Sequence, residues 1–289
     1  MCRTRGHLRA FVAESYLRAG RPDACLTELG ASISIPEILR TRASCLAGLG
    51  KIEDALVVLG QARVEGGKAR ELAFDAARFA ASDEDDARAH RELDGFLKAM
   101  RIEQYDATLA RASFAQQLGR DGEAAGLLSA LYGSTRPDLD LRLRWADALA
   151  RTERIDDAVT LLHELVAEQP DDPTRLNALG FTLVEANRSL DEAEVYLRHA
   201  YRLASDETFI IDSLGWLMHV RGKDVLAERL LERAVNGSPS DPEILMHLGE
   251  VYKARGKRDE AHALFVKAAH LQPSRPIKAK LDRLVRDRA

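Results

Sequence analysis

The sequence predicts an all-α solenoid built from about eight consecutive pairs of helices. Three observations favour this class: a small residue recurs every 34 or 35 residues, the prolines fall between the expected helices, and the composition is that of a helical chain. Of the 289 residues, 46% are apolar and 30% are charged, whereas only 6% are aromatic. Composition and periodicity therefore indicate a soluble chain of repeated helical units.

The small residue is the one that lets the two helices of a pair approach each other closely. It occurs at Ala13, Ala43, Ala77, Ala112, Ala146, Gly180, Gly215 and Gly249, in steps of 30, 34, 35, 34, 34, 35 and 34 residues. This register predicts a repeat array over residues 1–275, with units that begin near residues 6, 36, 70, 105, 139, 173, 208 and 242. The first unit is four residues short, and the unit around Ala77 is degenerate.

The prolines provide an independent test of this register, because proline interrupts a helix interior but suits a first turn or a connection. All nine fall at expected turns: Pro22, Pro36, Pro137, Pro170, Pro173, Pro239, Pro242, Pro273 and Pro276. Three P-x-x-P pairs lie at unit junctions. Their spacing by whole repeats indicates that they mark helix boundaries and are not ligands for proline-binding domains. Asp172, Asp241 and Ser274 are predicted helix N-caps.

Residues 276–289 are expected to form a separate capping helix. Ile277, Leu281, Leu284 and Val285 share one helical face, and the opposite face is charged. A repeat array exposes apolar surface at its end unless a helix with a polar outer face covers it. The basic residues of the segment leave open a contact with an anionic surface.

Charge and cysteine content narrow the function further. The net charge of −4 argues against a broad nucleic-acid surface, and no apolar stretch is long enough for a transmembrane helix. Cys25 and Cys45 occupy apolar helical positions and are expected to be small buried side chains, without a disulfide framework or zinc site. The basic start of the sequence shows no apolar segment typical of a secretory signal.

The set Leu245-x-x-Leu248-Gly249-x-x-Tyr252, followed by Ala261, Phe265, Ala268 and Pro273, resembles the tetratricopeptide repeat (TPR) family. The resemblance spans almost the whole chain. It implies a right-handed superhelix in which the first helix of each pair lines a concave groove. It also implies protein or peptide binding without intrinsic catalysis.

The segment from 171 to 273 resembles the final repeats of bacterial outer-membrane TPR lipoproteins, in Asn177-Ala178-Leu179-Gly180-Phe181 and Asp212-Ser213-Leu214-Gly215-Trp216. That resemblance implies an adaptor in the bacterial envelope, with a carboxyl-terminal processing protease or its substrates as partners. The sequence departs from the pattern in three ways. It is much shorter, Phe181 stands where tyrosine is usual, and no lipobox precedes Cys2. The chain is therefore expected to be cytoplasmic as it stands, and periplasmic or outer-membrane-associated if it is a fragment of such a lipoprotein.

Helical spacing selects the side chains that face the groove in the last three units. The predicted partner-binding residues are Asn177, Phe181, Asp212, Trp216, His219, Met246 and Glu250. Amide, carboxylate, aromatic and thioether groups in one row suit an extended peptide. Two alternatives stay open: the aromatic residues Phe181 and Trp216 fill space between units, and Asn177 and Asp212 pair with each other or with Ser213.

Catalytic motifs are absent from the sequence. No H-E-x-x-H, G-x-S-x-G, phosphate-binding G-x-x-x-x-G-K or G-x-G-x-x-G occurs, so neither an enzyme nor a metal or other cofactor is expected. The favoured function is a non-catalytic scaffold that binds a protein or peptide in the groove. The alternative is an assembly element that self-associates through the ends of the array.

Overall fold

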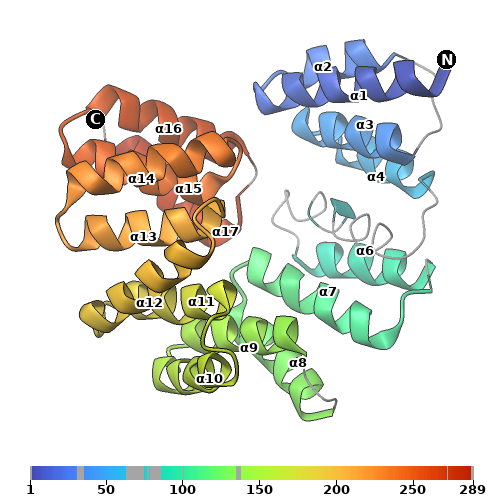
Figure 1. Ribbon diagram of the computed structural model, residues 1–289. Helices are drawn as coiled ribbons and strands as arrows, with labels where there is room; N and C mark the ends of the chain where they lie inside the picture. Colours follow the sequence, from blue (N-terminus) through green and yellow to red (C-terminus); the bar gives the residue numbers. More distant parts are fainter. Residues whose placement is uncertain are drawn as a thin grey trace. The chain divides into compact units, whose positions relative to one another are not determined.

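The computed structural model describes residues 2–30, 36–62, 75, 76, 78, 86–99, 101–134, 138–271 and 273–287. Every regular element in these ranges is an α-helix, so the predicted all-α solenoid class is confirmed (Figure 1). Within the same ranges, no helix is both long and apolar enough to cross a membrane. The chain divides into two compact units, Met1–Phe114 and Ala115–Ala289.

In the part of the first unit that the structure describes, two helix pairs are complete. Its helices are α1 (Cys2–Arg18), α2 (Pro22–Leu29), α3 (Pro36–Gly48), α4 (Ile52–Gly60), α6 (Asp86–Ala99) and most of α7 (Gln104–Gln117). Ala13 and Ala43, two of the predicted small residues, are completely buried where their helices meet the second helix of the pair. Most of the degenerate unit expected near residue 70, including Ala77, lies outside the described residues.

A disulfide bond joins Cys25 of α2 to Cys45 of α3, with the two Cα atoms 6.0 Å apart. The expectation that both side chains are buried is confirmed, since neither is exposed at all. The expectation that they do not pair is wrong. Twenty residues separate the two cysteines, and the spacing in sequence gave no sign that the second helix of one pair packs against the first helix of the next at this point.

Reduction of this disulfide is expected to lower the free energy of unfolding of the first unit by about 3 kcal/mol, because the bond closes a loop between residues 20 positions apart in the unfolded chain. Urea unfolding with and without a phosphine reductant measures the difference. A Cys25→Ala/Cys45→Ala variant serves as the control and should not respond to the reductant. Alkylation of all three cysteines in denatured, unreduced protein would contradict the bond.

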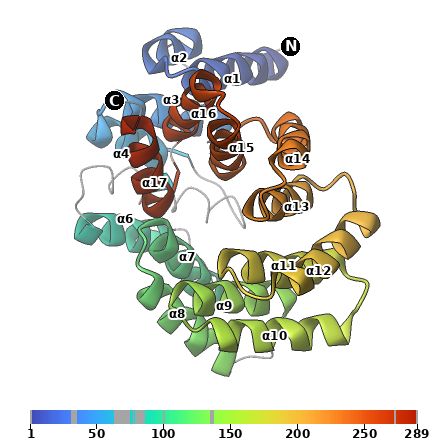
Figure 2. The same cartoon turned by 90° about the vertical axis from the view of Figure 1, so that its left-hand side faces the viewer.

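The second unit is a stack of antiparallel helix pairs that follow one another along a curve (Figures 1 and 2). After the end of α7 come α8 (Asp121–Ser134), α9 (Leu139–Arg151), α10 (Ile155–Glu168), α11 (Pro173–Glu185) and α12 (Leu190–Leu203). The stack continues through α13 (Thr208–Val220), α14 (Asp224–Gly237), α15 (Pro242–Ala254), α16 (Arg258–His270) and α17 (Arg275–Arg286).

Local sequence explains where these helices begin. The Asp172 carboxylate accepts from the backbone N–H groups of Thr174 and Arg175 at 2.8 and 3.2 Å, and Pro173 follows as the first residue of α11. Asp241 caps α15 in the same way, ahead of Pro242. Both N-cap predictions are confirmed. Ser274 occupies the N-cap position of α17 but makes no side-chain capping bond.

The helices of the last three pairs touch where the sequence places glycine. A Cβ atom built on Gly180 would lie 2.6 Å from Leu197 Cγ, and one on Gly249 would lie 2.4 Å from Phe265 Cε1. Real side chains do not approach so closely, so these positions accept nothing larger than a hydrogen atom without movement of the partner helix. The predicted role of the small residue is confirmed for these pairs.

Helix α17 packs against α15 and α16 through the apolar face that the sequence predicted. Leu281 is completely buried beside Met246 and Phe265, and Ile277, Leu284 and Val285 pack around the same cluster. At the other end of the second unit's curve, a Cβ built on Gly119 would lie 3.1 Å from the Pro276 ring. The first turn of α17 therefore reaches across to the turn that follows α7.

Candidate functional site

The predicted groove residues lie on α11, α13 and α15, the first helices of three consecutive pairs. Asn177, Asp212, Trp216 and Met246 are at most 9% exposed, whereas Phe181, His219 and Glu250 are partly buried. Buried polar groups must find partners within the protein. The contacts of these side chains therefore decide which of them remain available to a ligand.

A chain of polar contacts runs through the buried members of this set. His247 Nδ1 of α15 donates to both carboxylate oxygens of Asp212 of α13, at 2.9 and 3.1 Å. The imidazole also stacks on the Trp216 ring, with the ring centroids 4.3 Å apart and the planes 17° apart. Trp216 Nε1 donates to Glu185 Oε1 of α11 at 2.8 Å. The four side chains thus link three successive helix pairs.

Electrostatics favour the protonated form of His247. Burial by itself lowers the pKa of a histidine, but the Asp212 carboxylate and its hydrogen bond, helped by Glu243 and Glu185, outweigh burial and raise the pKa of His247 above 6.5. The imidazolium and Asp212 therefore form a buried ion pair between α13 and α15. The sequence left open a pairing of Asp212 with Asn177 or Ser213, and the structure pairs it with His247 instead.

This ion pair predicts that the protein loses stability as the pH rises. A group whose pKa is higher in the folded state stabilises the fold fully below its unfolded pKa of about 6.5 and loses that contribution as the pH rises through the folded pKa. The free energy of unfolding should therefore fall as the pH rises above about 6.5, and fall less steeply in His247→Gln. Chemical unfolding at several pH values measures both slopes. Equal slopes would contradict the assignment.

Asn177 and Ser213 differ in how they are satisfied. Ser213 Oγ donates to the backbone carbonyl of Phe209 at 2.9 Å, a bond within its own helix. The Asn177 side-chain oxygen is buried and accepts no hydrogen bond from any described residue. No hydrogen bond joins Asn177 to Asp212 among the described residues, and no described group explains its presence in the core.

Two more predicted residues are held by neighbouring side chains. The Lys280 ammonium of α17 lies 3.0 Å from Glu250 Oε1 and 5.5 Å from the centroid of the Trp216 ring. His219 Nδ1 contacts Asp224 Oδ1 at 2.7 Å, at the start of α14. Glu250 thus already binds a cation supplied by the last helix, and His219 joins α13 to its own pair partner.

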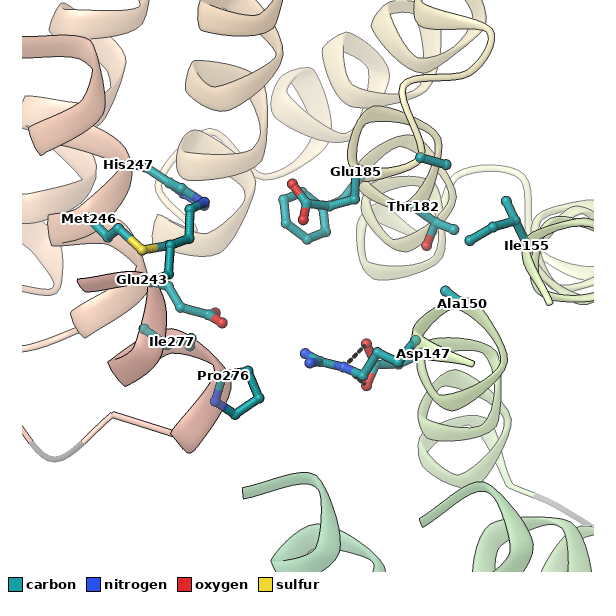
Figure 3. Close-up of a pocket in the computed structure, with 14 residues that line it drawn as sticks. Asp147, Ala150, Ile155, Thr182, Glu185, Glu243, Met246, His247, Pro276 and Ile277 are labelled. Atoms are coloured by element: carbon teal, nitrogen blue, oxygen red, sulfur yellow. Dashed lines mark hydrogen bonds and ion pairs between the residues drawn. The ribbon is translucent and has the colours of Figure 1, made fainter. Parts of the chain in front are cut away.

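A hollow of about 410 Å³ opens beside this network, within the second unit (Figure 3). One wall consists of side chains from α9, from the start of α10 and from α11 and its C-cap, and the other of side chains from α15 and α17. The first wall contributes Asp147, Ala150, Arg151, Ile155, Phe181, Thr182, Glu185 and Ala186, and the second contributes Glu243, Met246, His247, Pro276, Ile277 and Lys280. The structure therefore brings only Phe181 and Met246, of the seven predicted residues, to the surface of the hollow.

Glu243 and Arg151, on opposite walls of the hollow, differ in how their charges are balanced. Burial within the hollow raises the pKa of Glu243, Asp241 and Asp212 raise it further, and His247 and Arg151 offset only part of the increase. Arg151 Nε donates to Asp147 at 3.0 Å, which neutralises both groups on the facing wall. Glu243 makes no ion pair with any residue that the structure describes.

Sequence reasoning missed most of the lining of this hollow. Asp147, Arg151, Glu185, Glu243, His247 and Lys280 line the hollow, but none of them is among the predicted partner-binding residues. Glu243 lies in the first turn of α15 and Lys280 lies in the capping helix. Helical spacing from the small residue of each unit selects neither of them.

The stacked helix pairs with glycine contacts and a concave hollow define a helical-repeat solenoid. Comparisons with curated proteins and solved structures show which proteins the chain is similar to. A TPR repeat-containing protein of Pseudomonas aeruginosa is 36% identical over 113 residues, which cover 38% of this chain but only 19% of that protein. The chain thus spans about a fifth of the length of this curated relative. No protein-family model matches the chain.

Two solved structures share the fold. A TPR protein from Parabacteroides merdae aligns with a TM-score of 0.59 at 13% identity, over 87% of this chain and 98% of its own. A thermophilic TPR protein from Thermus thermophilus aligns with a TM-score of 0.54 at 21% identity, over 63% of this chain and 97% of its own. The resemblance to tetratricopeptide repeat proteins that the sequence motif indicated is confirmed.

Proposed function

We propose that this chain is a non-catalytic scaffold that binds a protein or peptide partner in the hollow between α9 and α11 on one side and α15 and α17 on the other. The hollow is the observation that carries the proposal. It combines partly buried apolar groups, Phe181 and Ile277, with unpaired carboxylates, as surfaces that bind extended peptides do. The TPR relatives support a scaffold role.

A photoreactive residue tests the location. Replacement of Phe181 by p-benzoylphenylalanine should give cross-linked partners in cells, whereas the same replacement of Val195, which is exposed on α12, should not. Thr182→Trp, which fills the hollow from α11, should abolish the adducts. Adducts that persist in Thr182→Trp, or equal adducts from position 195, would place the partner elsewhere. Circular dichroism confirms that each variant is folded.

The finer proposal is an adaptor for a bacterial envelope protease. It is supported by the resemblance of residues 171–273 to the final repeats of outer-membrane TPR lipoproteins that serve carboxyl-terminal processing proteases. The cross-linking experiment tests this as well, because mass spectrometry identifies the captured partner. A protease of that class or one of its substrates is expected, and adducts that contain neither would reject the adaptor role.

Self-association is a second candidate function, and one observation favours it. Leu8 and Phe11, one turn apart on α1, are 64% and 63% exposed. Large apolar side chains grouped on a surface often mark an interface. Sedimentation velocity should then show a dimer that Leu8→Glu/Phe11→Glu dissociates. A monomer at all concentrations would remove this candidate.

A further inference from the structure

The charges around the hollow do not balance. Three carboxylates in or beside the hollow have cationic partners. Asp147, in the lining, pairs with Arg151, and Asp212 and Glu250, beside the hollow, pair with His247 and Lys280. Two carboxylates, those of Glu185 and Glu243, have no ion-pair partner among the described residues. Glu185 accepts a hydrogen bond from Trp216 through one oxygen only. The hollow therefore holds two solvent-exposed carboxyl groups that have no ion-pair partner among the described residues.

The two unpaired carboxylates face the same space. Figure 3 shows Glu243 extending into the hollow from the α15 wall and Glu185 extending into it from the α11 wall. Apolar groups lie on both walls beside them, Phe181 on α11 and Ile277 on α17. A ligand that neutralises the acids must therefore also cover apolar surface.

The protein itself shows how this surface binds a cation. The Lys280 ammonium lies at the edge of the hollow, 3.0 Å from the Glu250 carboxylate and 5.5 Å from the Trp216 ring centroid. A carboxylate together with an aromatic face is a favourable environment for a lysine or arginine head group. Glu243 with Glu185, beside Phe181, offers the same combination of groups without an internal cation.

We propose that the hollow recognises a basic side chain of an extended partner segment, with the lysine or arginine between Glu243 and Glu185 and a neighbouring apolar side chain against Phe181 and Ile277. This inference rests on the proposed function and specifies the chemistry of the partner. Charge complementarity selects a basic segment over an acidic one, because an acidic side chain would lie against two carboxyl groups that have no ion-pair partner.

The probes that test this inference are three nine-residue peptides, identical except for a central lysine, glutamine or glutamate flanked by leucines. Binding to the full chain is followed by NMR of ¹³C-labelled methionine methyl groups, since Met246 lines the hollow whereas Met218 is completely buried and serves as an internal control. The lysine peptide should shift the Met246 signal with an affinity at least about fivefold tighter than the glutamine peptide. The glutamate peptide should bind most weakly, and added salt should reduce the differences.

Two variants locate the charge that the peptide recognises. Glu243→Gln should remove most of the preference for lysine. Glu164→Gln, the same change at an exposed position on α10 away from the hollow, should leave it intact. Equal affinity for the lysine and glutamine peptides, or an unchanged preference in Glu243→Gln, overturns the inference. If no peptide shifts Met246 while cross-linking through position 181 still captures a partner, the basic-segment inference fails and the proposed function stands. Loss of that cross-linking overturns the proposed function itself.

Discussion

Replacement of Asp212 by alanine is expected to lower the free energy of unfolding by about 3–5 kcal/mol, because it leaves His247 without its counter-ion in the core. Both side chains are close to 10% exposed or less, so water cannot replace the lost partner. The same change removes a contact that links α13 to α15. Urea unfolding at pH 6, where the imidazolium is protonated in the wild-type protein, measures the loss.

An exposed ion pair provides the matched control for this substitution. Asp156 lies 2.6 Å from Arg188, but its side chain is 93% exposed, so Asp156→Ala should leave the unfolding midpoint nearly unchanged. A double variant, Asp212→Asn/His247→Gln, replaces the ion pair by neutral hydrogen-bonding groups and should recover part of the stability that Asp212→Ala loses. A midpoint for Asp212→Ala equal to that of Asp156→Ala would show that the buried pair does not stabilise the fold.

Replacement of Gly215 by leucine is expected to cost about 2–3 kcal/mol of unfolding free energy, because it overfills the contact between α13 and α14. Even a Cβ atom on Gly215 would lie 2.8 Å from Leu231 Cγ and 3.3 Å from Leu230 Cβ. The helices must separate to admit a larger side chain, and separation exposes the apolar surface between them. Thermal and urea unfolding measure the loss.

A glycine-to-leucine substitution in open surroundings is the control that distinguishes overpacking from the change in helix propensity. A Cβ on Gly126, in the exposed part of α8, would meet nothing within 4 Å, so Gly126→Leu should keep or slightly raise the stability. Leu231→Ala makes room for the new side chain and should restore part of the loss in Gly215→Leu, which a double-mutant cycle detects. Additive effects of Gly215→Leu and Leu231→Ala would show that the two side chains do not compete for the same space.

Much of the fold could be predicted because its determinants are local and repeat. Gly180, Gly215 and Gly249 mark the helix contacts, since only a residue without a side chain allows such close packing. Asp172 and Asp241 precede prolines at the starts of α11 and α15, where each carboxylate caps backbone groups two and three residues later. Spacing along one helix is enough to identify these residues.

The candidate site could be predicted only in part, because its contacts join residues one unit apart in sequence. Asp212 and His247 are 35 residues apart, and Trp216 and Glu185 are 31 residues apart. Helical spacing assigns Asp212 and Trp216 to the correct face, but it does not reveal that the neighbouring unit satisfies them. The same limit applies to Cys25 and Cys45. Their burial was predicted correctly, but their disulfide bond was not predicted.

The sequence by itself therefore determined the class of repeat, the order of the helix pairs in the second unit and the residues at which their helices touch. These properties depend on side-chain size and capping within a few turns of helix. Only the tertiary structure decided which polar groups remain free. Packing of α13 against α15 pairs Asp212 with His247, and docking of α17 brings Lys280 to Glu250. His247 and Lys280 are already paired with other carboxylates, so Glu243 and Glu185 are left without an ion-pair partner. These two carboxyl groups set the chemistry that we propose for the partner.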